Sequence, residues 1–314
     1  MTRFIVSRLL QTGLVLFILT VITFILMKLA PGDPVRSILR VEEVAITREQ
    51  EEALRNELLL DQPFLQYFAW LKGIFQFDLG TSHSLNVPVV EVLLGRLPNT
   101  LLLTAGGLLV MMVIACVLGV GSAYFYNRPF DHISRIFALL GASLPSFWLG
   151  LLLIQWFSLH LGWLPSSGSS SLLHLILPSL TLGIGMSAVY ARLLRSSLVE
   201  EYSQPHIQAA RAKGMTKWTL LTRHSMKAAV VPVLSMFGLS IGSLLGGTVV
   251  VETVFSWPGI GSMVIEAILR RDYPLIQGYI LLTGVFVITA NFIADIIMSM
   301  LDPRIRMGEE SFRK

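Results

Sequence analysis

The sequence has little charge for its length. Only 14% of its 314 residues are Asp, Glu, Lys or Arg, whereas 54% are hydrophobic, and soluble domains carry about a quarter charged residues. This composition excludes an ordinary soluble domain and indicates lipid as the solvent. The formal net charge of +4 comes from basic residues scattered between apolar segments, so no dense basic patch suggests a nucleic-acid partner.

Cysteine and nucleotide-binding motifs are also scarce. Cys116 is the single cysteine, which excludes an intramolecular disulfide and a cysteine-based metal site. No Gly-x-x-x-x-Gly-Lys-Ser/Thr phosphate loop occurs anywhere in the chain. The sequence also shows no set of residues that could form a catalytic site. We therefore expect a non-enzymatic chain that binds no cofactor of its own.

Long apolar runs are abundant. A hydrocarbon core about 30 Å thick requires about 20 apolar residues in a helix. Six segments meet this requirement: Leu9–Leu29, Leu101–Tyr124, Ile136–His160, Leu172–Leu193, Ala229–Val251 and Leu275–Leu301. The expected fold is an all-α polytopic membrane protein with six transmembrane helices. The first segment is longer than a signal-peptide core and lacks a cleavage site, so we interpret it as a retained span.

The distribution of Lys and Arg predicts the orientation. With a cytoplasmic N-terminus, most of the 24 Lys and Arg residues fall in cytoplasmic segments, and the short outer turn 161–171 carries no charge. Basic residues favour the cytoplasmic side. Both termini are therefore expected in the cytoplasm. The chain itself is expected in the plasma or inner membrane.

The outer loop 31–99 contains two helical patterns. Residues 47–60 combine a Thr-Arg-Glu-Gln start with spaced apolar residues and predict an amphipathic helix that ends before Pro63. Residues 64–77 are rich in aromatic residues. They predict a helix that either packs on the spans or lies at the membrane interface.

The segment 194–228, between the fourth and fifth spans, is the most informative cytoplasmic loop. Ser203 can cap a helix whose first turn contains Pro205, and Gly214 can end it in a left-handed conformation. Thr216 can then cap a second helix. The pattern predicts a helix, a glycine corner and another helix, which together form a rigid knob suited to a groove in a partner.

Within this loop, Gln208-Ala209-Ala210-x-x-x-Gly214 resembles the EAA loop of ABC importer permeases, with Gln208 where glutamate is commonest. The order and spacing of further motifs resemble the dipeptide, oligopeptide and nickel permease family over nearly the whole chain. These motifs include Ala-Pro-Gly-Asp-Pro at 30–34, Asp-Leu-Gly-Thr-Ser at 78–82, Arg-Leu-Pro-Asn-Thr at 96–100, Ser-Leu-Pro-Ser-Phe-Trp at 143–148, Glu-Thr-Val-Phe-Ser-Trp-Pro-Gly at 252–259, Arg-Asp-Tyr-Pro at 271–274 and Leu-Asp-Pro-Arg at 301–304.

The resemblance implies a type I importer fold. Residues 1–30 would form the N-terminus and first span, 31–99 the outer loop, 97–301 a five-helix core and 302–314 a cytoplasmic tail. It further implies a second homologous permease, two cytoplasmic ATP-binding subunits that use the ATP, and an extracytoplasmic solute-binding protein. The Gln208–Gly214 segment would then be the coupling helix that contacts the ATP-binding subunits.

Four residues are candidates for the transport pathway or its gate: Pro145, Trp148, Trp257 and Asp295. Prolines in spans can produce kinks, and a carboxylate inside a span is a functional candidate. Ordinary packing kinks and a structural role for Asp295 are the alternatives. Gly238, Gly242 and Gly246 form a small-residue stripe that is a candidate permease interface, with pore lining and packing inside the chain as alternatives.

The substrate remains open between two classes. The length and local residues of the outer loop favour nickel, and short peptides are the alternative substrate. Imidazole is a suitable nickel ligand, but the six histidines are not spaced as a ligand pair. An ion-coupled secondary transporter is a more distant alternative, because it would require central ionisable residues and often an internal repeat.

Overall fold

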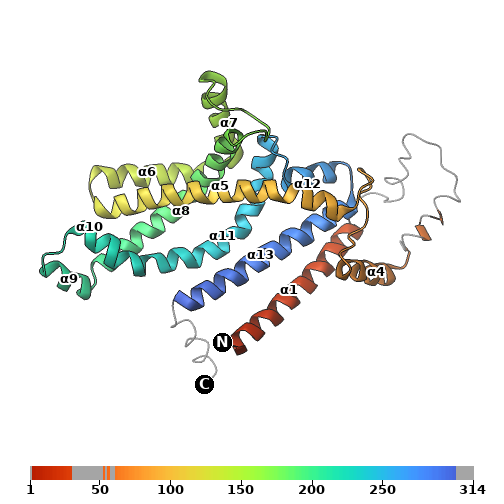
Figure 1. The fold of residues 1–314 in the computed structure, drawn as a ribbon, viewed down its shortest axis with the longest axis horizontal. Helices are drawn as coiled ribbons and strands as arrows, with labels where there is room; N and C mark the ends of the chain where they lie inside the picture. Colours follow the sequence, from red (N-terminus) through yellow and green to blue (C-terminus); the bar gives the residue numbers. More distant parts are fainter. Residues whose placement is uncertain (1, 30–51, 54, 57–60, 302–314) are drawn as a thin grey trace. The chain divides into compact units, whose positions relative to one another are not determined.

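The computed structural model describes residues 2–29, 52, 53, 55, 56 and 61–301 (Figure 1). Side chains of residues 2–8, 238, 239, 241, 243, 245, 295 and 297–301 lie outside the described set, as do the expected helix 47–60 taken as a whole and the tail 302–314. Across the described residues, the isolated bridge between Thr81 and Pro88 is the only β pairing. The all-α prediction is confirmed.

The helices follow the apolar runs of the sequence. In chain order they are α1 (Thr2–Leu29), α4 (Pro63–Phe75), α5 (Val89–Tyr124), α6 (Pro129–Ser143), α7 (Ser146–Leu153), the π-helical η1 (Ile154–His160), α8 (Leu173–Tyr202), α9 (Pro205–Ala212), α10 (Lys217–Thr219), the π-helical η2 (Leu220–Ser225), α11 (Met226–Val254), α12 (Ile260–Leu269) and α13 (Tyr273–Leu301).

By length and composition, four helices among the described residues can cross a membrane: α1, α5, α8 and α13. The bent pair formed by α6 with α7 and η1 makes a fifth if it counts as one span. α11 is continuous over the fifth predicted span. The backbone is therefore helical over all six predicted spans, apart from the break in the third. α4 matches the helix expected over 64–77.

The third span differs from the prediction. We expected a continuous helix over 136–160, but the chain is extended at Leu144 (φ −80°, ψ 130°) and Pro145 precedes α7. A residue before proline disfavours the helical conformation, so α6 ends and α7 starts at an angle of 108°. Pro178 and Pro232, by contrast, lie inside the continuous helices α8 and α11.

The chain divides into two compact units. The first contains residues 1–99 and 259–288. In it, α13 closely approaches the start of α5, because a Cβ atom at Gly278 would lie 2.6 Å from Val89 and 3.0 Å from Leu93. The second unit contains residues 100–258 and 289–314.

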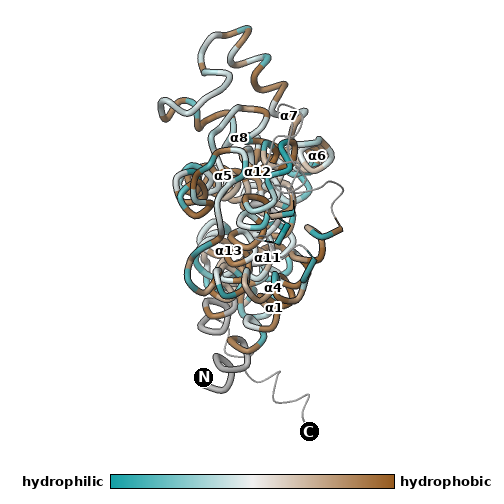
Figure 2. The backbone as a smooth tube through the Cα atoms, turned by 90° about the vertical axis from the view of Figure 1, so that its right-hand side faces the viewer, coloured by the Kyte–Doolittle hydropathy of each residue, from teal (hydrophilic) through white to brown (hydrophobic). Residues whose placement is uncertain are grey.

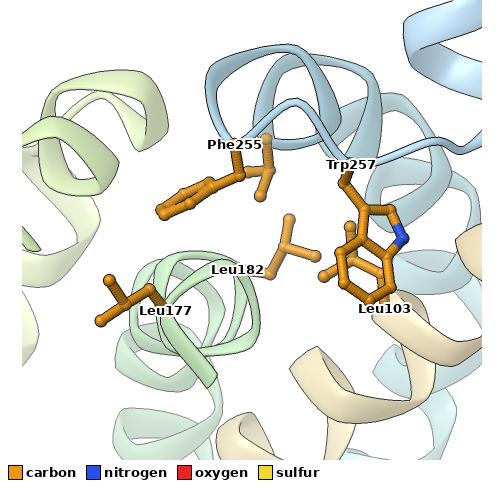
Figure 3. Close-up of a cluster of buried hydrophobic side chains, with 6 residues drawn as sticks. Leu103, Leu177, Leu182, Phe255 and Trp257 are labelled. Atoms are coloured by element: carbon orange, nitrogen blue, oxygen red, sulfur yellow. The ribbon is translucent and has the colours of Figure 1, made fainter. Parts of the chain in front are cut away.

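The core of the second unit forms around α8. Leu177 and Leu182 of α8 pack with Leu103 of α5, and with Phe255 and Trp257 from the turn after α11 (Figure 3). Gly150 of α7 lies against the aromatic ring of Phe255, since a Cβ at Gly150 would lie 3.1 Å from it. The Phe255–Trp257 turn is thus held by buried apolar contacts.

Candidate functional site

The expected knob after α8 is present. α8 runs on to Tyr202, further than the predicted span end at Leu193, and α9 follows after a break of two residues. Pro205 occupies the first turn of α9, where its missing N–H costs nothing. The predicted cap is wrong: Gln204 precedes α9, and the Ser203 hydroxyl instead donates to the Glu200 carbonyl at 2.6 Å.

The glycine corner is confirmed. Gly214 has φ +87°, and its N–H donates to the Arg211 carbonyl at 2.9 Å. No atom lies within 4 Å of a Cβ built at Gly214, so backbone conformation rather than space favours glycine here. The Thr216 side chain accepts a hydrogen bond from the Thr219 N–H, as expected of a helix cap, and α10 leads through η2 into α11.

The knob presents small and polar residues. Gln208, Ala209 and Gly214 are exposed and Ala210 is half-buried, whereas Ile207 is only 1% exposed. Ile207 therefore anchors α9 on the protein while the opposite face stays open. The Gln208 amide donates to the Tyr202 carbonyl at 3.1 Å, which fixes this side chain on the end of α8.

Lys217 ties the knob to the end of α5. Its ammonium donates a hydrogen bond to the Tyr124 carbonyl and lies 5.3 Å and 5.8 Å from the ring centroids of Tyr124 and Tyr202. The Trp218 ring meets Tyr124 edge-on at 5.8 Å. Burial lowers the pKa of Lys217, and the positive charges of Arg128 and Arg211 lower it further. The orphan carbonyls at the end of a helix favour such a cation.

Apolar packing reinforces this attachment. Leu221 of η2 is buried with Leu194 and Leu198 of α8, Ala123 of α5 and Ala229 of α11. The segment that follows the knob is therefore packed against three long helices, α5, α8 and α11.

A buried ion pair connects α6 and α8 in the same unit. Nε and Nη2 of Arg195 donate to the fully buried Asp131 carboxylate, at 2.6 Å and 2.7 Å, and the Asn127 N–H donates to it at 3.0 Å. The Arg195 guanidinium also lies 5.2 Å from the Tyr126 ring centroid. Sequence reasoning missed this pair, although Asp131 is the lone acid in a short basic segment, which is the signal that could have identified it.

Glu252 is a second residue that sequence reasoning missed. We expected Asp295 to be the acidic residue inside a span, but α11 extends to Val254 and includes Glu252, which is fully buried. The Thr100 hydroxyl donates to its carboxylate at 2.6 Å. The position of Glu252 directly after the fifth predicted span was the available signal.

Three of the four pathway candidates have described side chains, and these differ in their surroundings. Trp257 is 2% exposed in the core around Phe255, whereas Trp148 of α7 is 44% exposed. Pro145 is exposed at the bend between α6 and α7. Asp295 lies on α13, and its side chain is outside the described set.

Of the glycine stripe, Gly246 is exposed and a Cβ built there would meet nothing within 4 Å. Gly242 is half-buried, and the surroundings of Gly238 are outside the described set. Of the two stripe positions that the structure describes, Gly246 is thus the one at which α11 is exposed.

The histidines make separate local contacts. His160 contacts Gln155, His174 contacts Ser171, and His206 lies 3.1 Å from Glu201. In the part of the chain that the structure describes, no group of three or more His, Cys, Asp or Glu could hold a metal ion.

The described residues thus combine helices able to cross a membrane with a short helical knob after α8. Comparison with known proteins identifies the family of the chain. Residues 115–307 match the family described as binding-protein-dependent transport system inner membrane component, and residues 1–104 match its N-terminal counterpart. The chain belongs to this family.

The similarity extends to individual relatives. The glutathione transport system permease protein GsiC of Escherichia coli O6:H1 is 39% identical over 307 residues, covering 98% of this chain and 99% of GsiC. GsiC of Salmonella choleraesuis is 38% identical with the same coverage. A chain of the inward-facing MetNI methionine ABC transporter shares the fold, with TM-score 0.54 and 20% identity over 67% of this chain and 96% of that chain.

The chain is accordingly a multi-pass inner-membrane permease subunit of an ABC importer with a type I fold. It is non-catalytic, and ATP hydrolysis belongs to a separate subunit of the importer.

Proposed function

We propose that this permease imports a short peptide or a peptide-like solute such as glutathione. The supporting observation is the full-length similarity to glutathione permeases, at 39% identity over 98% of the chain. These relatives favour the peptide alternative over the nickel substrate that the outer loop suggested.

The proposed machine contains this chain, a second homologous permease, two cytoplasmic ATP-binding subunits and an extracytoplasmic solute-binding protein. This chain binds no cofactor, and ATP is used by its partners. The small-residue face at Gly246 is part of the proposed interface with the second permease, because it is exposed and open.

In this proposal, α9 and the Gly214 corner contact an ATP-binding subunit. The exposed Ala209 and Gly214 allow a close approach of the partner, while Ile207 and Lys217 hold the knob on the spans. Closure of the ATP-binding pair would then move α5, α8 and α11 as a group and switch the pathway between its outward-open and inward-open states.

The test is ATP-dependent uptake into proteoliposomes that contain the whole importer and its binding protein. Labelled glutathione, a labelled dipeptide and radioactive nickel are supplied separately, and an importer with an inactive ATP-binding subunit is the control. Accumulation of glutathione or dipeptide that requires ATP supports the proposal. Nickel accumulation that excess peptide leaves unchanged would overturn it.

A further inference from the structure

α4 exposes an aromatic face. Phe64, Phe68 and Phe75 are 81%, 62% and 80% exposed, and Leu65 beside them is 56% exposed. At 100° per residue the three Phe side chains fall within a narrow arc of the helix. Lys72 is the only charged residue in α4, and no residue of the helix is buried. Such a surface is costly in water.

A neighbouring face of α4, which carries Tyr67 and Trp70, packs on α1 in the same compact unit (Figure 1). The Tyr67 ring lies 5.3 Å from the Phe24 ring, and the Trp70 ring 6.2 Å from it, measured between centroids. The hydroxyls of Tyr67 and Thr20 are hydrogen-bonded at 2.9 Å. This attachment fixes α4 at the level of residues 20–24 of α1.

That level lies inside the membrane. The apolar run of α1 extends from Leu9 to Leu29, and the exposed Lys28 in its last turn marks the polar boundary. With a rise of about 1.5 Å per residue, Phe24 lies roughly 8 Å and Thr20 roughly 14 Å inside Leu29. Both helices are mainly hydrophobic along this part of their length (Figure 2).

We propose that α4 is embedded in one leaflet of the bilayer, with the Phe64, Phe68 and Phe75 face against lipid acyl chains. One observation favours lipid over a protein partner, and another favours lipid over water. The exposed residues of α1 at the same level, Ile22 and Ile25, are aliphatic like those of a lipid-facing span, and the Tyr67–Thr20 bond satisfies the two hydroxyls internally, as a water-free environment requires.

Lys72 is compatible with this placement. It is exposed on the edge of the Phe face, and its four-carbon stem can lie along the apolar surface while the ammonium reaches the headgroups. This inference depends on the membrane location of the chain and not on its substrate.

The test uses spin labels on the assembled importer in lipid nanodiscs, with Cys116→Ser and the cysteines of the other subunits also replaced. Labels are introduced by Phe68→Cys and Phe75→Cys. Ile22→Cys provides the lipid standard, and Ser169→Cys, an exposed position in the outer turn 161–171, provides the aqueous standard. Accessibility to oxygen, which dissolves in hydrocarbon, is compared with accessibility to chromium oxalate, which stays in water.

At positions 68 and 75, the ratio of oxygen to chromium oxalate accessibility should match position 22 and exceed position 169 by roughly tenfold, because hydrocarbon excludes the charged complex. A ratio like that at position 169 would place α4 in water and overturn the proposal. Labels shielded from both reagents would reveal a protein partner and overturn it equally. Because all four positions are exposed, failure to fold is not expected from any one label.

Discussion

Asp131, Glu252 and Asp272 are fully buried carboxylates, and each is satisfied in a different way. Asp131 pairs with Arg195, Glu252 accepts from Thr100, and Asp272 accepts from the 82–84 segment. A buried charge costs several kcal/mol unless it is paired or hydrogen-bonded. These residues are therefore fixed points to which the long helices are attached.

Removing one partner of the Asp131–Arg195 pair should destabilise the protein. Asp131→Asn leaves the Arg195 guanidinium without its buried counter-ion and should cost about 3 kcal/mol. The measurement is thermal unfolding of the purified importer, with Arg195→Met and the double variant completing a cycle. If the double variant loses as much as the two single variants combined, the pair contributes no coupling.

Lys217 should affect coupling more than folding. Lys217→Met removes a charge-assisted hydrogen bond worth about 1.5 kcal/mol, so the equilibrium constant for attachment of the knob should fall roughly tenfold. Uptake per ATP hydrolysed should fall, while the amount of chain in the membrane stays near normal. Lys217→Arg keeps the charge and the donors and is the matched control. An unchanged ratio of uptake to hydrolysis in Lys217→Met would contradict this role.

At the scale of elements, the glycine corner separates α9 from α10. Gly214→Pro demands φ near −65° where the chain has +87°, and it removes the N–H that donates to Arg211. We expect loss of uptake with normal membrane insertion. Gly214→Asn is the control, because asparagine tolerates the left-handed conformation. Normal uptake by Gly214→Pro would exclude a coupling role for the corner.

A second element-scale feature is the attachment of the 82–84 segment to the start of α13. The Ser82 and Ser84 hydroxyls donate to Asp272 at 2.5 Å and 2.7 Å, and the Ser84 N–H donates at 2.9 Å. Burial opposes ionisation, yet these hydrogen bonds together hold the pKa of Asp272 below its ordinary value. Burial lowers the pKa of His83, against the attraction of Asp272.

The lowered pKa values of His83 and Asp272 predict that the 82–84 segment is attached more weakly to the start of α13 in acid. Below the ordinary His pKa of 6.5, the unfolded segment takes up a proton before the buried His83 does, so stability falls as the pH decreases. The Asp272 contribution persists to more acidic pH and is lost only as the pH falls through its lowered pKa. Hydrogen exchange of residues 80–86, corrected for the intrinsic rate, should therefore accelerate below pH 6.5.

His83→Gln is the matched variant for this pH effect. This substitution should abolish the acceleration of hydrogen exchange just below pH 6.5 and leave the contribution of Asp272 to stability intact. Acceleration of equal size in His83→Gln would assign the effect to another group.

The long helices could be predicted from the sequence because lipid demands continuous apolar runs, and these are local. The Gly214 corner and the Thr216 cap could be predicted for the same reason, since they depend on adjacent residues. The Asp131–Arg195 pair joins residues 64 positions apart, so the local sequence can mark Asp131 as unusual but cannot identify Arg195 as its partner. Likewise, Pro145 coincides with a sharp bend whereas Pro178 does not, because the outcome depends on packing around each proline.

At the scale of the whole molecule, the distribution of Lys and Arg predicts that both termini are cytoplasmic. Alkaline phosphatase, which is active only outside the cytoplasm, should be inactive when fused after Lys314 and active when fused within the uncharged turn 161–171. Activity after Lys314 would require an odd number of crossings or the opposite orientation.

The bend between α6 and α7 also affects how the chain enters the membrane during synthesis. α6 has 15 residues, and α7 with η1 is of similar length, so each arm reaches only about 22 Å at 1.5 Å per residue, against a hydrocarbon thickness of about 30 Å. Neither arm alone is long enough for the insertion machinery to release it as a stable span. If α6 and α7 with η1 count as one span, the two arms enter the bilayer as one segment, and the Asp131–Arg195 pair can form only after α8 has been synthesised.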